Sequence, residues 1–186
     1  MLEVIVTFVF TLIIYNLENF WWKLGLLILL LILILPGVYA MLSVAPYVPS
    51  NKRQIKALLN LGQFKKSDVV ADFGCGDGRV VRAVVQEVKV KKGIGYEISL
   101  PTYVLALVQK YFAKSKESIR MQNFWNLETD QFDVIICFLQ IDPMKKFEAE
   151  IWPKLKKGTR VLSNTFKMKG LKPTATEDGV YLYVKK

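Results

Sequence analysis

The stretch Asp68-Val-Val-Ala-Asp-Phe-Gly-Cys-Gly-Asp-Gly-Arg79 indicates the fold class of this 186-residue chain. Residues 69–73 form an apolar run, with Asp72 near its end, and have the length that one buried parallel strand needs. Three glycines at alternate positions follow, and a helical pattern of apolar residues begins at Arg79. The order strand, glycine turn and helix predicts an open α/β sheet that presents backbone N–H groups to a ligand beyond the carboxyl end of the strand.

The spacing of the glycines narrows the class of ligand. The G-x-G-x-x-G fingerprint of dinucleotide-binding folds is absent because Arg79 follows Gly78, and no Gly-Lys-Ser/Thr follows the turn as in a P-loop. An acid two positions before the first glycine, followed by G-x-G-x-G, resembles motif I of the class I S-adenosylmethionine (SAM) methyltransferases. That resemblance implies that the turn packs against the methionine part of SAM and that Asp72 assists in holding it. A tight turn without a ligand is the alternative interpretation.

A second acid supports a cofactor site. Residues 93–97, Gly-Ile-Gly-Tyr-Glu, predict a short strand that ends at Glu97. This glutamate lies about twenty residues beyond the glycine turn, which places its carboxylate at the tip of the neighbouring strand. There it is expected to accept hydrogen bonds from two ribose hydroxyls.

Charge and composition limit the partners. Hydrophobic residues make up 52% of the chain and are concentrated at the amino end. Residues 1–44 carry one lysine and two glutamates, a net charge of −1, so the overall charge of +10 leaves +11 for the remainder. This asymmetry predicts an anionic partner surface, either lipid headgroups or nucleic acid. Cys75 and Cys137 lie in apolar strand contexts typical of reduced thiols, and with no histidine the sequence predicts no metal site.

The amino-terminal region predicts a membrane anchor over residues 1–44. Residues 24–42 are almost unbroken apolar sequence, about as long as a helix that crosses the hydrocarbon core, and Trp21 and Trp22 stand at one edge as an aromatic belt would. Residues 2–17 predict the first arm of a hairpin, with an interfacial helix or a cleaved signal peptide as alternatives. The positive charge beyond Val44 predicts that residues 45–186 lie on the cytoplasmic side of the cell membrane.

Beyond residue 50, strand and helix patterns alternate. Strands are predicted over residues 69–73, 93–97, 119–122, 132–138 and 159–166, and helices over residues 51–61 (with Ser50 as the N-cap), 79–88, 99–112 and 142–155. Residues 174–177 and 180–184, joined by Asp178-Gly179, predict a β-hairpin. Together these patterns predict a doubly wound α/β sheet finished by an antiparallel pair.

Further motifs resemble those of one methyltransferase family. They are Pro46-Tyr-Val-Pro49, the glycine motif, Gly95-Tyr-Glu-Ile98, Asn123-Phe-Trp125, Phe138-Leu139, Lys157-Gly-Thr-Arg-Val161 and Val180-Tyr-Leu-Tyr-Val184. In these residues the chain resembles the archaeal protein-lysine methyltransferases and their membrane-anchored eukaryotic relatives, which methylate lysines of ATP synthase c subunit and adenine nucleotide translocase. The resemblance implies a Rossmann-like, seven-stranded class I methyltransferase sheet over residues 45–186, preceded by the transmembrane segment.

The resemblance also implies the residues of the site. The cofactor-binding set comprises Asp72, Phe73, Gly74, Cys75, Gly76 and Gly78 at the methionine end, Glu97 at the ribose, and Asn123 and Phe124 at the adenine. Asn123 stands where many methyltransferases have aspartate, so an amide oxygen would meet the adenine N6. Tyr47, Trp125 and Phe138 are predicted to wall a channel for the substrate, with core packing or interface anchoring as the alternative.

These observations predict a membrane-anchored protein-lysine N-methyltransferase whose partners are SAM, a lipid bilayer and a substrate lysine. Residues 139–142 lack the Asn/Asp-Pro-Pro-Tyr/Phe tetrad typical of amino-methylating nucleic-acid enzymes, and residues 138–141 instead offer an apolar rim suited to the methylene stem of a lysine. Nucleic acid is therefore the less favoured partner. The alternatives are a membrane-tethered RNA or small-molecule methyltransferase, suggested by the basic charge, and a non-catalytic SAM-binding membrane scaffold.

Overall fold

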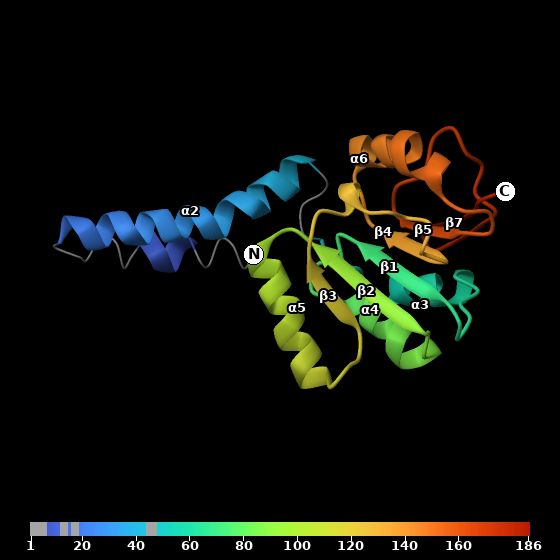
Figure 1. The fold of residues 1–186 in the computed structure, drawn as a ribbon, viewed down its shortest axis with the longest axis horizontal. Helices are drawn as coiled ribbons and strands as arrows, with labels where there is room; N and C mark the ends of the chain where they lie inside the picture. Colours follow the sequence, from blue (N-terminus) through green and yellow to red (C-terminus); the bar gives the residue numbers. More distant parts are fainter. Residues whose placement is uncertain (1–6, 12–14, 16–18, 44–47) are drawn as a thin grey trace.

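The centre of the molecule is a sheet that joins segments from β1 to the carboxyl-terminal hairpin (Figure 1). The structure is a computed structural model that describes residues 7–11, 15, 19–43 and 48–186. In this part of the chain the strands are β1 (Val69–Phe73), β2 (Lys92–Glu97), β3 (Ser118–Met121), β4 (Val134–Cys137), β5 (Arg160–Asn164), β6 (Ala175–Glu177) and β7 (Val180–Val184). They form a seven-stranded sheet in the order β3-β2-β1-β4-β5-β7-β6, which confirms the predicted sheet.

The register of the strands brings their carboxyl ends to one edge. β1 to β5 are parallel, whereas β7 is antiparallel to both β5 and β6, as the predicted terminal hairpin requires. Phe73 at the end of β1 pairs with Tyr96 of β2 and with Cys137 of β4. The strand order reverses at β1, between β2 and β4, which is where open α/β sheets bind ligands.

The strands are buried on both faces because helices cover each side. Alternate residues of β1 point to opposite faces, so Val70 packs with the cluster that includes Leu58 and Val84, and Ala71 packs with the cluster that includes Phe147. The first face is covered by α3 (Lys52–Leu61), α4 (Arg79–Ala83) and α5 (Leu100–Ala113), and the second by α6 (Ile141–Lys146) (Figure 1). This layered arrangement explains why the strands read as nearly continuous apolar runs.

The helix boundaries follow local signals, with one correction. Asn51, not Ser50, is the N-cap of α3: its side chain accepts a hydrogen bond from the Gln54 backbone N–H, and the Gln54 side chain accepts from the Asn51 N–H in a capping box. The hydroxyl of Ser50 is instead used in a tertiary contact with Asn164. Ser99 precedes α5 as predicted, with Pro101 in the first turn.

Two predicted helices are not α-helical throughout, because their later turns are π-helical or 3-10. The helix predicted over residues 79–88 consists of α4 followed by the π-helical turn Val84–Val88. The helix predicted over residues 142–155 consists of α6, the π-helical turn Phe147–Ile151 and the short 3-10 turn Trp152–Lys154. Pro153 lies in this last turn, where its missing N–H ends the regular helix.

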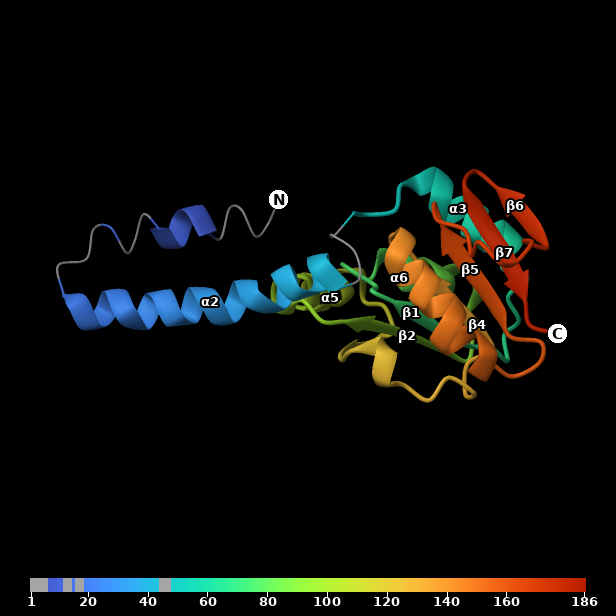
Figure 2. The same ribbon diagram turned by 90° about the horizontal axis from the view of Figure 1, so that it is seen from above.

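The amino-terminal segment contains α2 (Phe20–Ser43), a long helix that extends away from the sheet and contacts α5 (Figure 2). Crossing a bilayer takes about 20 apolar helical residues. Among the residues that the structure describes, no helix is both long and apolar enough to do so, and the predicted transmembrane helix over residues 24–42 is therefore not supported. Most of the predicted hairpin arm over residues 2–17, and the predicted boundary between residues 44 and 45, lie outside the described residues.

A buried ion pair fastens the amino edge of the sheet. The guanidinium of Arg160, at the start of β5, lies 2.7 Å from a carboxylate oxygen of Asp68, the residue before β1. Arg160 also donates hydrogen bonds to the carbonyls of Gly62 and Gln63, beyond the end of α3. These contacts tie β5 to α3 and β1 at the edge opposite the carboxyl ends of the parallel strands.

Candidate active site

The glycine turn at the end of β1 has the backbone conformation that the motif predicts. Gly74, Gly76 and Gly78 have φ values of 75°, 58° and 76°, which other residues adopt only with strain. The backbone N–H groups of Gly74 and Cys75 both donate to the carbonyl of Tyr96, which holds the turn against the end of β2. A Cβ at Gly74 would meet nothing within 4 Å, so the turn leaves open space beside bare backbone.

Glu97 joins the glycine turn to the start of α5. One oxygen of its carboxylate accepts a hydrogen bond from the Gly76 N–H at 3.0 Å, and the other accepts from the N–H groups of Ile98 and Ser99, both at 2.8 Å. The side chain is 8% exposed. Glu97 therefore fixes the shape of the turn, a role that the sequence did not predict. It also lies near enough to the other predicted strand-tip acid, Asp72, for its charge to act on that carboxylate.

Asp72 is a buried carboxylate with an unused oxygen. It is 4% exposed, and its Oδ2 has no hydrogen-bond partner among the residues that the structure describes. Burial, followed by the negative charge of Glu97, raises the pKa of Asp72 from 3.8 to about 7, although a hydrogen bond from the Val81 backbone opposes the shift. An unsatisfied buried acceptor two residues before the open glycine turn fits a ligand that carries positive charge and donor groups, as SAM does.

The other residues predicted at the methionine end, Phe73, Cys75 and Gly78, make packing and backbone contacts that hold the glycine turn in place. Phe73 is fully buried and stacks on Phe124, with ring centroids 4.9 Å apart. Cys75 is buried and its pKa is raised well above the usual value by burial and by the surrounding carboxylates, so its thiol stays protonated. A Cβ at Gly95 would lie 2.6 Å from the Cys75 sulfur, which explains why glycine occupies that position of β2. The backbone N–H of Gly78 donates to the Cys75 carbonyl, and Gly78 is the N-cap residue of α4.

The residues predicted at the adenine and along the substrate channel lie in different surroundings in the structure. The Asn123 side-chain oxygen accepts a hydrogen bond from the Trp125 N–H and so caps the short 3-10 helix Phe124–Asn126. Phe124 lies in the core, whereas Trp125 is half-buried with the Lys146 ammonium 4.6 Å from its ring centroid. Trp125 packs on Phe124, whereas Phe138, which is half-buried after β4, packs on Phe166. The two predicted wall residues therefore have different aromatic partners. Tyr47 lies outside the described residues.

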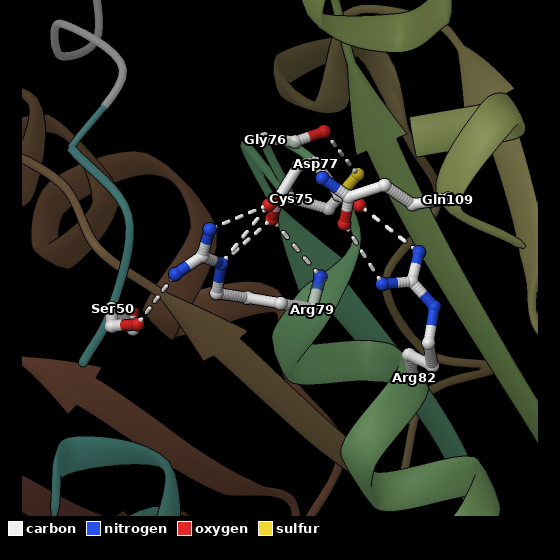
Figure 3. A network of polar contacts seen from close by, with 7 residues as sticks. All are labelled: Ser50, Cys75, Gly76, Asp77, Arg79, Arg82 and Gln109. Atoms are coloured by element: carbon white, nitrogen blue, oxygen red, sulfur yellow. Dashed lines mark hydrogen bonds and ion pairs between the residues drawn. The ribbon is translucent and has the colours of Figure 1, made fainter. Parts of the chain in front are cut away.

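A charged network that the sequence did not predict joins the glycine turn to residues 48–50, the linker before α3 (Figure 3). Asp77, 2% exposed, receives hydrogen bonds from the backbone and guanidinium of Arg79, and the guanidinium also donates to the Ser50 carbonyl. Burial alone would raise the pKa of Asp77, but the bonds and charge of Arg79 hold it below its usual value. Arg82 donates to the Asp77 carbonyl and to the side chains of Gln109 and Glu117.

The linker is held from a second side by β5. The Asn164 amide, at the carboxyl end of β5, donates to the Ser50 hydroxyl at 3.1 Å. Ser50 therefore bridges the glycine turn and β5 across the carboxyl edge of the sheet. The only sequence signal for this network was the Asp77-Gly-Arg79 spacing, an acid and an arginine on either side of a turn glycine.

The sheet with its antiparallel seventh strand, the glycine turn and the two strand-tip carboxylates define a class I SAM-dependent methyltransferase. Comparison with known families narrows this class. A model described as the ANTKMT methyltransferase domain matches residues 72–175, and the chain belongs to that family.

Two relatives agree with this assignment, and one solved structure has a similar fold. A protein-lysine N-methyltransferase of Saccharolobus islandicus is 32% identical over 149 residues, which are 75% of this chain and 92% of that protein. The adenine nucleotide translocase lysine N-methyltransferase of Mus musculus is 27% identical over 70% of this chain and 57% of its own length, so the match spans little more than half of that relative. An RNA methyltransferase of Salinibacter ruber, solved with S-adenosylhomocysteine, has a TM-score of 0.70 and 25% identity and covers 74% of this chain and 94% of its own.

Proposed function

We propose that this chain is a protein-lysine N-methyltransferase that uses SAM. The observation that carries the proposal is the similarity to the Saccharolobus islandicus enzyme, which extends over nearly the whole of that protein. The half-buried ring of Phe138, which follows β4 at the same edge as the glycine turn, supports it, because a lysine side chain presents four methylene groups to its surroundings. Leu139, predicted as part of the same apolar rim, is instead fully buried in the core.

The residues at the carboxyl edge would divide the work of binding. Asp72 offers a buried acceptor for a cationic group, the backbone at Gly74 admits close approach, and Glu97 holds the turn in shape while keeping acceptor capacity for hydroxyls. When bound, SAM would supply a methyl carbon as the electrophile, with the neutral thioether S-adenosylhomocysteine as the leaving group. The contribution of the protein is therefore alignment of the acceptor amine rather than covalent chemistry.

The acceptor must reach the site without its proton. A lysine amine has a pKa near ~10.4 in water, so at neutral pH it is almost entirely protonated. An apolar wall would favour the neutral amine because it removes water from the charged form, and the ammonium proton would be released to solvent, which leaves the nitrogen lone pair free to accept a methyl group. We expect Phe138→Ala to lower kcat for protein methylation several-fold while leaving the affinity for SAM unchanged.

The function is tested by incubating the purified chain with methyl-labelled SAM and with separate membrane, soluble-protein and RNA fractions of the host. Label on lysine, located by peptide mapping, is the expected result. Asp72→Ala and Glu97→Arg should each abolish SAM binding in calorimetry and remove the label. Unchanged SAM affinity in both variants would refute the assignment of the site.

RNA methylation is a second candidate. It is favoured by the Salinibacter ruber structure, which is described as an RNA methyltransferase, and by the net charge of +10. The same fractionation separates the two functions, because label that survives protease and is released by ribonuclease would replace lysine by RNA as the acceptor.

We further propose that the chain works at a lipid surface with its basic domain facing the cytoplasmic leaflet. The support is α2, on which large apolar side chains are exposed on most sides, among them Trp21, Ile28, Leu31 and Ile32. Anionic headgroups would also attract the basic remainder of the chain. We expect the chain to float with vesicles of phosphatidylglycerol and phosphatidylcholine, and the variant Ile28→Glu/Leu31→Glu/Ile32→Glu to stay in the aqueous phase. Flotation of both proteins, or of neither, would contradict the proposal.

A further inference from the structure

A cavity of about 490 Å³ opens between α6 and the segment that connects β5 to β6. Its walls include Ile141 at the start of α6 and Phe166, Leu171 and Pro173 from the connecting segment, with Lys167 and Lys169 beside them. None of the predicted cofactor-binding residues lines this cavity. It is thus a separate site from the glycine turn.

The cavity nevertheless lies at the edge of the sheet where methyl transfer would take place. Ile141 follows the carboxyl end of β4, and Thr165, which also lines the cavity, follows the end of β5. Phe73 of β1 pairs with Cys137 of β4, which pairs with Ser163 of β5. Since neighbouring strands are ~4.8 Å apart, roughly 10 Å separate the glycine turn from the near side of the cavity.

The wall of the cavity is held in place by contacts on both sides. The backbone N–H of Met168 donates to the hydroxyl of Tyr183 at 3.0 Å, and that of Gly170 donates to a carboxylate oxygen of Glu148 at 2.8 Å. The ring of Phe166 packs on Phe138, the predicted channel wall, with centroids 6.2 Å apart. The segment therefore shapes the cavity before a ligand arrives and links it to the expected path of the substrate.

Among the described residues, the charged side chains that line the cavity are the two lysines Lys167 and Lys169, and the carboxylate of Glu148 lies behind the wall on Gly170. Lys167 and Lys169 are both exposed, and neither forms an ion pair with another residue that the structure describes. The nearby carboxylate of Asp142 is paired with Lys145 at 2.6 Å, and the Lys145 and Lys169 ammonium groups hold its pKa below the usual value. The Lys167 ammonium lies 5.6 Å from the ring centroid of Tyr181, but this contact leaves it without a carboxylate partner in the described part of the chain. An apolar cavity beside two exposed ammonium groups is complementary to a segment that carries both an apolar and an acidic side chain.

We infer that this cavity docks the segment of the substrate protein next to the target lysine, with an apolar side chain in the cavity and a carboxylate at Lys167 and Lys169. The inference rests on the proposed lysine methylation. An extended chain advances ~3.3 Å per residue, so a span of roughly 10 Å places the docked residues about three positions from the lysine. The substrate class is thus a lysine followed or preceded at that distance by an apolar and an acidic residue.

The test uses an array of lysine-centred peptides in which the positions about three residues from the lysine are apolar-acidic, apolar-amide or apolar-basic. With labelled SAM, we expect the apolar-acidic peptides to have a kcat/KM about tenfold above that of the amide peptides. Lys167→Glu/Lys169→Glu should reverse the order in favour of the basic peptides. The matched control Lys91→Glu/Lys92→Glu, at the amino end of β2, makes the same change in net charge and should keep the wild-type order.

A binding measurement separates this inference from the proposed function. Fluorescence anisotropy of a labelled apolar-acidic peptide, with norleucine in place of the lysine, reports docking without methylation, and calorimetry checks that SAM affinity is equal in all variants. Equal affinity of this peptide for the wild type and Lys167→Glu/Lys169→Glu would overturn the docking site even if lysine is methylated. If the peptide binds in a way that depends on the two lysines but the methyl label is found only in RNA, lysine methylation is overturned. The cavity would then remain a peptide-binding site.

Discussion

Asp72 is held where its ionised form is destabilised. Its pKa of about 7 means that, without a ligand, the folded protein binds a proton more tightly than the unfolded chain does. A group with a raised pKa stabilises the fold below its unfolded pKa, and this contribution is lost as the pH rises through the folded pKa. The window for Asp72 therefore runs from about pH 4 to about pH 7. A role of Asp72 in binding SAM would account for this cost in stability.

Asp72→Asn should make the unliganded protein more stable at pH 8 while it weakens SAM binding. A rise from 3.8 to about 7 corresponds to roughly 4 kcal/mol, which is an upper limit for the gain. Urea unfolding at pH 4 and at pH 8 measures the effect, and the difference between variant and wild type should appear only at the higher pH. A variant that is equally or less stable than the wild type at pH 8 would contradict the raised pKa.

Gly74→Ala tests whether the open space beside the turn is the cofactor site. The substitution forces a φ of 75° on alanine, at roughly 1–2 kcal/mol, and puts a methyl group where nothing lies within 4 Å. We expect a comparable loss of stability and a loss of SAM affinity of at least tenfold in calorimetry.

Gly158→Ala is the matched control for that variant. Gly158 has a φ of 83°, its Cβ position is also open, and it lies in the turn before β5 at the opposite edge of the sheet. Its stability loss should be similar and its SAM affinity normal. Equal affinity losses in the two variants would mean that backbone strain, not occupied space, weakens binding.

At the scale of elements, Arg79 joins α4, the glycine turn and the linker before α3. Removing its guanidinium leaves Asp77 buried with fewer donors and frees the Ser50 carbonyl. The pKa of Asp77 is lowered in the folded protein, so its contribution to stability is present above about pH 4 and is lost as the pH falls below that value.

Arg79→Gln is therefore expected to lower the free energy of unfolding by about 2–3 kcal/mol at pH 7 and by less at pH 3. SAM affinity should fall as well, because the turn loses its anchor. Arg53→Gln, which breaks the exposed pair of Arg53 with Asp178, should leave the free energy of unfolding almost unchanged, because water screens an exposed ion pair. Equal effects of the two substitutions in urea unfolding would show that the Arg79 network does not hold the turn.

At the scale of the whole molecule, the carboxyl edge of the sheet holds the candidate binding residues, and the amino edge holds contacts that stabilise the fold. The carboxyl edge holds the glycines with positive φ, the unsatisfied Asp72 oxygen and the cavity between α6 and the segment that connects β5 to β6. The amino edge holds the buried pair of Asp68 and Arg160, with the further bonds from Arg160 to the end of α3. Substitutions at the amino edge should consequently change stability without changing binding.

Arg160→Met should lower the free energy of unfolding by about 3–5 kcal/mol, because it leaves the Asp68 carboxylate buried and unpaired. SAM affinity and kcat, measured at a temperature where the variant is folded, should match the wild type. The double variant Asp68→Asn/Arg160→Met should regain much of the lost stability. A large loss of SAM affinity in folded Arg160→Met would contradict the separation of the two edges.

Much of the fold and the centre of the site could be predicted because they depend on short-range patterns. Residues 68–79 specify strand, turn and helix locally, and the position of Glu97 follows from the regular return of the chain to the neighbouring strand. The terminal hairpin was readable from Asp178-Gly179 between two apolar runs. The prediction of Ser50 as the N-cap is wrong because serine and asparagine are both good N-cap residues. Only the tertiary structure shows that the Ser50 hydroxyl accepts a hydrogen bond from Asn164 instead.

The sequence by itself determined the class of sheet, the glycine turn and the pair of acids, because periodicity and backbone preference are local properties of the chain. The tertiary structure alone decided what those groups contact: that Glu97 caps the turn, that Arg79 reaches the linker, and that a cationic cavity lies beside β5. It also left the transmembrane interpretation of residues 24–42 without support among the described helices. Such contacts join residues far apart in the chain, and no local pattern records which distant partner a side chain will meet.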